Sequence, residues 1–245
     1  MFKKVTVAIA MTGLMAGLAS AGQLPKSGIN GSLHDMNAVV GATDDAFQRT
    51  CVFCHTPHNA SATAEPLWNR TDTAANPSPY GWVAPANNGI VVDPLIGPTR
   101  LCQSCHDGSI AVDSHGTNNS TVGGLKLGAT NPKRIADLTI THPVGFLYSA
   151  AVTQRPGELV PVTDGFLSEP SATLLAYAFD THARAGLAKA GPKIDDTLYS
   201  GYMTCASCHE VHNTTNASSD TGKSYNYFLR ARQEGSAICI SCHIK

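Results

Sequence analysis

The chain has few of the residues that normally build a hydrophobic core. Aromatic residues make up 7% of its 245 positions, with only two tryptophans, whereas 22 glycines and 14 prolines interrupt the sequence. Charged residues are also scarce at 14%, and the net charge of −1 excludes a strongly basic nucleic-acid-binding surface. Beyond the N-terminal region, no apolar run approaches the length of a transmembrane helix. We therefore expect a stabilising element other than packed side chains.

The N-terminal residues have the pattern of a secretory signal peptide. Lys3 and Lys4 are followed by an apolar run over residues 5–18 and by the small residues Ala19-Ser20-Ala21. The apolar run is too short to be a comfortable membrane anchor. We expect residues 1–21 to be a signal peptide, and residues 22–245 to form one exported domain at the cell surface or outside the cell, or alternatively in the periplasm.

All eight cysteines lie in four C-x-x-C-H motifs. This pattern is the attachment site of c-type haem: both thiols add to the vinyl groups of one porphyrin, and the adjacent histidine binds the iron from one face. The sequence therefore predicts four haem c groups. The predicted thioether cysteines are Cys51, Cys54, Cys102, Cys105, Cys205, Cys208, Cys239 and Cys242, and the predicted proximal ligands are His55, His106, His209 and His243.

Two other uses of these cysteines are less consistent with the pattern. Zinc sites use C-x-x-C pairs, but they do not need a histidine directly after every second cysteine. A framework of four disulfides leaves the four histidines equally unexplained. Histidine occupies about 4% of the chain, so its chance appearance after all four pairs is a negligible alternative.

The motifs form an internal repeat of two halves. Each half begins with C-x-x-C-H-x-x-H-N, ending at His58-Asn59 and at His212-Asn213, and continues to a plain C-x-x-C-H motif. A repeated pair of motifs predicts two pairs of haems. The expected fold is a multihaem cytochrome c: mostly coil with short helices and few strands, around a core of four stacked haems.

Six histidines remain as possible second axial ligands, and four are needed. His58 and His212 are the first candidates, because each lies three residues after a proximal histidine and can reach a neighbouring haem. His142, before Pro143, and His34, before Asp35, are the next candidates. The other two, His115 and His182, are predicted to be ordinary loop histidines, although replacement of a listed candidate by either of them stays open. In the expected mature chain the only methionines are Met36 and Met203, which compete poorly as ligands.

The sequence also predicts a small amount of regular structure. Residues 35–50 and 171–189 favour helices, and residues 89–95 and 138–148 favour strands. Segments 71–88 and 113–134 are rich in Asn, Ser, Thr, Gly and Pro, which is typical of surface loops.

Several segments resemble the multihaem cytochromes of metal-reducing bacteria. They are Ser-Leu-His34-Asp-Met, Cys-Val-Phe-Cys-His-Thr-Pro-His58-Asn-Ala, Leu-Cys-Gln-Ser-Cys-His106-Asp-Gly, Thr-His142-Pro-Val-Gly and Cys-Ile-Ser-Cys-His243. The nearest likeness is to the OmcE-type tetrahaem cytochromes, which polymerise into extracellular nanowires. The resemblance implies bis-histidine haems in alternating parallel and T-shaped contacts, with one distal histidine donated across the subunit interface. His34, near the mature N-terminus, is then the expected donor. Residues 60–100 and 150–200 carry little of the resemblance.

Three functions follow from these patterns. The first is a non-enzymatic electron-transfer protein that forms a head-to-tail homopolymer and connects redox partner cytochromes to an external electron acceptor. The second is a monomeric periplasmic electron shuttle. The third is a multihaem reductase of the nitrite or hydroxylamine type, which needs an iron with an open coordination position.

Overall fold

Short helical turns and coil dominate the computed structural model, which describes residues 29–61, 67–73, 77–78, 80, 93–116, 123–166, 193–212, 227–231, 233 and 236–244. Within these ranges the chain is mostly coil, as expected. The helical elements are η1 (Thr50–Phe53), α1 (Pro98–His106), η4 (Leu138–Ile140), α2 (Tyr148–Gln154), η5 (Asp195–Thr197), α4 (Cys205–Cys208) and α5 (Ala237–Ile240), and the strands are β1 (Phe146–Leu147) and β2 (Tyr202–Met203).

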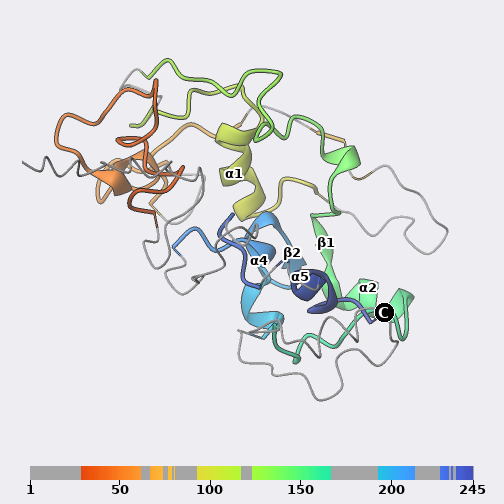
Figure 1. Cartoon of the computed structure of the whole chain (residues 1–245). Coiled ribbons are helices and arrows are strands. Elements are labelled where there is room, and N and C mark those ends of the chain that lie inside the picture. The colour runs from red at the N-terminus through yellow and green to blue at the C-terminus, as the bar shows by residue number, and fades with distance from the viewer. Residues whose placement is uncertain are drawn as a thin grey trace, which may run out of the picture.

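The four motifs each begin in one of the helical turns: η1, α1, α4 and α5. In Figure 1 the first-motif segment, in orange, and α5, in blue, stand on opposite sides, with α1 and α4 between them. The two central helices are in contact, and the backbone N–H of Cys205 donates to Thr99 Oγ1 at 3.2 Å. The second and third motifs are therefore adjacent in space.

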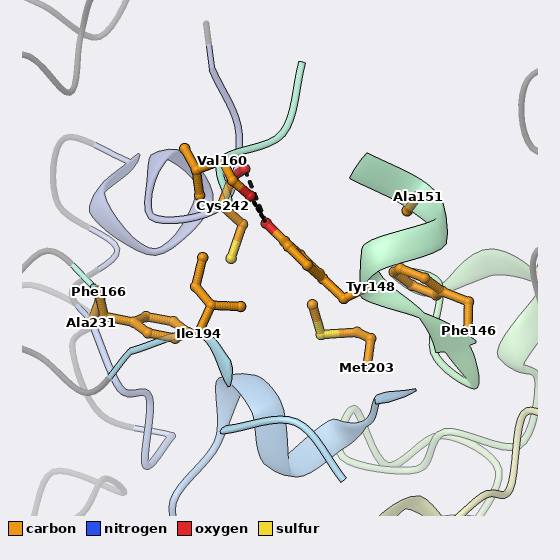
Figure 2. Packing of buried hydrophobic residues seen from close by; sticks show 9 residues of the cluster. All are labelled: Phe146, Tyr148, Ala151, Val160, Phe166, Ile194, Met203, Ala231 and Cys242. Carbon is orange, nitrogen blue, oxygen red and sulfur yellow. Dashed lines mark hydrogen bonds between the residues drawn. The ribbon is translucent and has the colours of Figure 1, made fainter. Parts of the chain in front are cut away.

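A hydrophobic cluster lies beside the last motif (Figure 2). It forms where β1 pairs antiparallel with β2, with Phe146 opposite Met203. Tyr148 is buried at its centre, and its hydroxyl donates to the carbonyl of Val160 at 3.1 Å, a satisfied polar group in an apolar setting. The members are Phe146, Tyr148, Ala151, Val160, Phe166, Ile194, Met203, Ala231 and Cys242.

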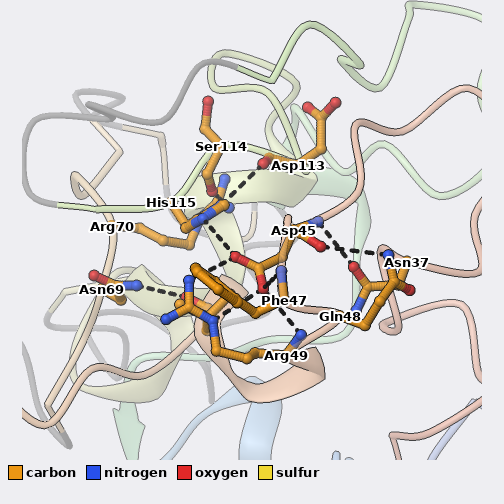
Figure 3. Close-up of polar contacts among 11 residues, drawn as sticks. Asn37, Asp45, Phe47, Gln48, Arg49, Asn69, Arg70, Asp113, Ser114 and His115 are labelled. Carbon is orange, nitrogen blue, oxygen red and sulfur yellow. Dashed lines mark hydrogen bonds and ion pairs between the residues drawn. The ribbon is translucent and has the colours of Figure 1, made fainter.

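A second, smaller cluster lies beside the first motif and contains Met36, Phe53 and Val112. Polar contacts surround it (Figure 3): the Asp45 carboxylate lies between Arg49 and the ring of His115. Met36 and Met203 are thus each buried in a hydrophobic cluster, one in each half of the chain. Both positions suit a packing role for these methionines.

The predicted helix over residues 35–50 is wrong, because this segment consists of turns and bends up to the start of η1. Its aspartates bond to the backbone in competition with a helix. Asp35 Oδ2 accepts from the N–H of Gly31, and Asp45 Oδ2 accepts from the N–H groups of Phe47 and Arg49.

The strand predictions have mixed outcomes. Residues 138–148 do contain β1, but only at two positions, preceded by the 3-10 turn η4. In the described part of 89–95, residues 93–95, the chain makes a turn instead of a strand. The described parts of 71–88 and 113–134 contain neither helix nor strand, as predicted, but they are not all at the surface, because Thr73 and residues 113–115 are buried. The predicted signal peptide and the predicted helix over 171–189 lie outside the described residues.

The internal repeat extends well beyond the motifs. After each C-x-x-C-H-x-x-H segment the chain returns and makes a β-bridge with the proximal histidine, His55 to Trp68 and His209 to Leu229. Two flanking backbone bonds recur in each half. They are Thr56 N to Leu67 O and Asn69 N to Cys54 O in the first, and Glu210 N to Phe228 O and Arg230 N to Cys208 O in the second.

Side chains reinforce this correspondence. Asn69 Nδ2 donates to the carbonyl of Val52, and the equivalent Arg230 Nε donates to the carbonyl of Ala206, which is the same motif position. Leu67 and the equivalent Phe228 both have a φ of 56°, a left-handed conformation that is costly for such side chains. The two halves therefore share one local fold. Among the described residues, no helix is long and apolar enough to cross a membrane.

Candidate haem centres

In each motif the residue before the second cysteine is buried. These buried residues are Phe53, Ser104, Ser207 and Ser241. Two of the serines bond back into their own turn, Ser104 Oγ to Leu101 O and Ser241 Oγ to Ala237 O, both at 2.7 Å. The intervening residues thus anchor the turn and hold the two thiols in place.

Two proximal histidines are oriented by backbone carbonyls. His106 Nδ1 lies 2.7 Å from Lys133 O, and His209 Nδ1 lies 2.6 Å from Tyr227 O. A carbonyl only accepts, so Nδ1 carries the proton and Nε2 keeps its lone pair. This arrangement is the usual one for metal-binding histidines, because it sets both the tautomer and the direction of the ring.

Three predicted distal histidines lie opposite three proximal ones. The ring centres of His34 and His106 are 6.1 Å apart, those of His55 and His212 are 6.1 Å apart, and those of His142 and His243 are 6.2 Å apart. A histidine nitrogen binds a transition metal at about 2 Å, with the ring centre about 1 Å further, so two axial ligands on one iron have centres about 6 Å apart. All three separations match that spacing.

Two of these distal histidines are themselves oriented through Nδ1. His142 Nδ1 lies 3.0 Å from Pro143 O, and His212 Nδ1 lies 3.2 Å from Glu210 Oε1. Their Nε2 atoms therefore remain available for a metal. The sequence interpretation did not include Glu210, although the contrast between His-Thr-Pro-His in the first half and His-Glu-Val-His in the second was visible in it.

His34 lies within its own chain, next to two proximal histidines. Its ring is 4.8 Å from that of Phe228 and 6.1 Å from that of His106. The pKa of His34 is lowered to about 4, chiefly by burial and to a smaller extent by the nearby His106 and His209. The imidazole is therefore neutral at physiological pH, which is the state that binds a metal.

His58 and His115 differ from these three, because neither makes a ring contact with a proximal histidine among the described residues. His58 is exposed, as His142 and His212 also are, and its backbone carbonyl accepts from Thr56 Oγ1 at 2.7 Å. His115 is buried against the edge of Phe53, with Nε2 3.6 Å from Asp45 Oδ1 (Figure 3). His115 is thus engaged by a carboxylate, as suits a structural histidine. His182 lies outside the described residues.

Neighbouring motifs approach each other through their cysteines. Burial raises the pKa of the Cys54 thiol to about 12, and the nearby Cys105 contributes in the same direction. The pKa of Cys102 is raised chiefly by its hydrogen bond to Cys205. Burial raises the pKa of Cys208 to about 11, with a smaller contribution from Cys239.

One hydrogen bond and two electrostatic influences thus relate the first motif to the second, the second to the third, and the third to the fourth. The motif regions are therefore close neighbours throughout. Such an arrangement was not evident from the sequence, because spacing along the chain says nothing about order in space.

Buried donors without partners provide a test of whether a haem fits here. Trp68 Nε1, Gln103 Nε2 and Arg70 Nε are buried and make no hydrogen bond. Trp68 bridges to His55, and Gln103 lies within the second motif. Arg70 is 2% exposed, and its terminal nitrogens donate to the carbonyls of Ala111, Val112 and Ser114. Unpaired donors beside the motifs suit the propionate carboxylates of a haem. The residues present thus fit this group.

The described residues give the other uses of cysteine no support. None of the eight cysteines is in a disulfide. Within the described ranges, which include every motif cysteine and histidine, no three His, Cys, Asp or Glu side chains gather into a metal site. No family model and no curated protein matches the chain. The candidate site therefore depends on the motifs and on the geometry around them.

Proposed function

We propose that this protein is a tetrahaem cytochrome c that transfers electrons through four covalently bound haems. The observation that carries the proposal is the set of three histidine pairs at 6.1–6.2 Å, each combining one motif histidine with one distal candidate. When bound, the haems supply iron that cycles between the ferrous and ferric states. Two imidazoles on one iron leave no position for a substrate, which favours electron transfer over catalysis.

The ligand assignment follows from these pairs. His212 serves the haem attached beside His55, His34 serves the one beside His106, and His142 serves the one beside His243. The fourth proximal histidine, His209, makes no ring contact at this spacing among the described residues. His58 is the remaining candidate, and it is exposed.

We assign His58 to the haem attached beside His209 in a neighbouring copy of the chain. His58 is exposed next to the first motif, and His209 has no ring partner at this spacing within the described part of the chain, so the two complement each other between copies. Such a contact is head-to-tail, and it generates a filament when the rotation between copies does not close into a ring. This assignment replaces His34 as the donor across the interface, because the half-buried ring of His34 lies against His106 and Phe228 of its own chain.

The neighbouring thiols support an electron path in the order of the motifs. Cys54 lies near Cys105, Cys102 near Cys205, and Cys208 near Cys239. A filament that repeats this unit conducts electrons from redox partner cytochromes to an acceptor outside the cell.

A monomeric electron shuttle is the second candidate function, favoured by the fact that three of the four pairs form within one chain. It shares the haem chemistry but requires His58, or His182, to serve the haem beside His209 in the same subunit. The reductase interpretation requires that haem to keep an open position in the mature protein.

The decisive experiment purifies the exported protein from a bacterium that matures c-type cytochromes. We expect a mass with four haems, and only low-spin ferric signals in electron paramagnetic resonance of the assembled form. Electron microscopy of the extracellular fraction should show filaments. Isolated particles with four low-spin haems would establish the shuttle instead, and a persistent high-spin signal in the assembled form would favour the reductase.

A further inference from the structure

Glu210 holds the distal candidate His212 through two contacts. Its Oε1 atom lies 3.2 Å from His212 Nδ1 and accepts from the His212 backbone N–H at 3.1 Å. The same carboxylate is fixed from the other side, because Arg230 Nη2 donates to Oε2 at 3.1 Å. Arg230 is in turn tied to the third motif by its bond from Nε to Ala206 O. The carboxylate is therefore held at Nδ1.

This arrangement is unlike that of the other histidines with a defined Nδ1 contact in the candidate haem centres. In the described part of the chain, His106, His142 and His209 each direct Nδ1 to a neutral backbone carbonyl. The first half of the repeat has Thr56 where the second has Glu210, and the Thr56 hydroxyl bonds to the backbone of His58. The residue two positions before the distal candidate is thus a charged acceptor in the second half, Glu210, and an uncharged hydroxyl in the first half, Thr56.

A charged acceptor changes the electronic character of a ligand. A carboxylate draws the Nδ1 proton more strongly than a carbonyl does, which makes Nε2 a stronger electron donor. Stronger donation favours ferric over ferrous iron, and so lowers the reduction potential, which hydrogen bonding around a haem is known to tune. Arg230 moderates the effect without removing it, since Oε1 remains directed at His212.

We propose that Glu210 is a positioning residue that lowers the reduction potential of the haem attached beside His55, by bonding to Nδ1 of His212. The inference rests on the proposed function, in which His212 is the second ligand of that iron. It makes the first haem more reducing than it would be with a neutral acceptor at His212. One end of the electron path is therefore set apart from the rest by a side chain that is not itself a ligand.

The test uses Glu210→Gln in the holoprotein, because glutamine keeps the shape and an acceptor oxygen but removes the charge. We expect potentiometric titration to show one of the four potentials shifted upward while the other three stay in place. The ferric resonance of one haem should shift as well. Glu210→Thr, which installs the residue of the first half, should move the same potential in the same direction. Asp44→Asn is the matched control, because it removes an equal charge from an exposed carboxylate that contacts the Gln48 amide.

A second variant separates failure of this inference from failure of the proposed function. His212→Met should give one haem the optical signature of methionine ligation, or a high-spin signal. If it does, and Glu210→Gln leaves all four potentials unchanged or displaces all four together, the role of Glu210 is overturned while the ligand assignment stands. If His212→Met alters no ligation, the assignment of His212 is wrong and the role of Glu210 fails with it.

Discussion

The imidazole rings of His55 and His212 face each other nearly in parallel, with their centres 6.1 Å apart and their planes inclined by 22°. One belongs to the first half of the internal repeat and the other to the second. The two halves share a local fold, yet each depends on the other for this pair. The repeat is therefore not a pair of independent modules, and we expect neither half to complete its haem ligation alone.

The pair of His142 and His243 makes a prediction about spin state. His142→Ala removes the second ligand of the haem attached beside His243, so we expect a high-spin signal from one haem of the four in the oxidised protein. The matched control is His115→Asn, which alters a buried histidine whose Nε2 faces Asp45. That variant should keep all haems low-spin and lose about 1–3 kcal/mol of stability. A high-spin signal in His115→Asn would instead make His115 a ligand.

Assembly should depend on His58. In His58→Ala, we expect the extracellular filaments to disappear and the subunit to remain folded, because this side chain is exposed and makes no ring contact among the described residues. Pro57→Ala changes the adjacent exposed position and should leave filaments intact in electron micrographs. Filaments of normal appearance in His58→Ala would mean that another histidine ligates the haem beside His209.

Acid stability should depend on Asp45. The Arg49 guanidinium bonded to Asp45 holds the pKa of that carboxyl well below its usual range, against the opposing effect of burial. Because the folded pKa is depressed, the stabilisation is fully present above the ordinary aspartate pKa of 3.8 and is lost as the pH falls below it.

Urea unfolding at a series of pH values measures this effect. We expect the stability of the natural protein to fall below pH 4 more steeply than that of Asp45→Asn, which cannot titrate at this position. Asp44→Asn changes the exposed neighbour and should retain the steep dependence. Equal slopes in all three proteins would show that the Asp45–Arg49 pair contributes no pH-dependent stability.

The contact between the second and third motifs makes a prediction about stability. Thr99 is fully buried, and its hydroxyl accepts from the N–H of Cys205 at the start of α4. Thr99→Val keeps the shape but leaves this N–H unpaired, so the unfolding free energy should fall by about 1–3 kcal/mol. Thr99→Ser keeps the hydroxyl and should retain the bond, losing less stability in urea titrations. A smaller loss in Thr99→Val than in Thr99→Ser would show that the methyl group, not the bond, matters here.

Some features of the fold were predictable because they are local. Frequent glycine and proline and few aromatic residues predict coil with short helices, and the described residues are mostly coil. The predicted helix over residues 35–50 failed because Asp35 and Asp45 bond to nearby backbone N–H groups, which competes with helix formation. The strand predicted over residues 138–148 forms only at Phe146 and Leu147, because only these two residues pair with another strand.

The sequence by itself determined the number of predicted haems, the cysteines that would hold them and the proximal histidines. A covalent attachment motif is five consecutive residues, so no tertiary contact is needed to recognise it. For the distal ligands, the sequence provided candidate histidines but did not assign any of them to a particular haem. Only the tertiary structure brought His34 to His106, His212 to His55 and His142 to His243, and left His58 exposed. It also placed neighbouring motifs side by side and Glu210 against His212. Such contacts join residues far apart in the chain or depend on side-chain direction, and neither is encoded in spacing alone.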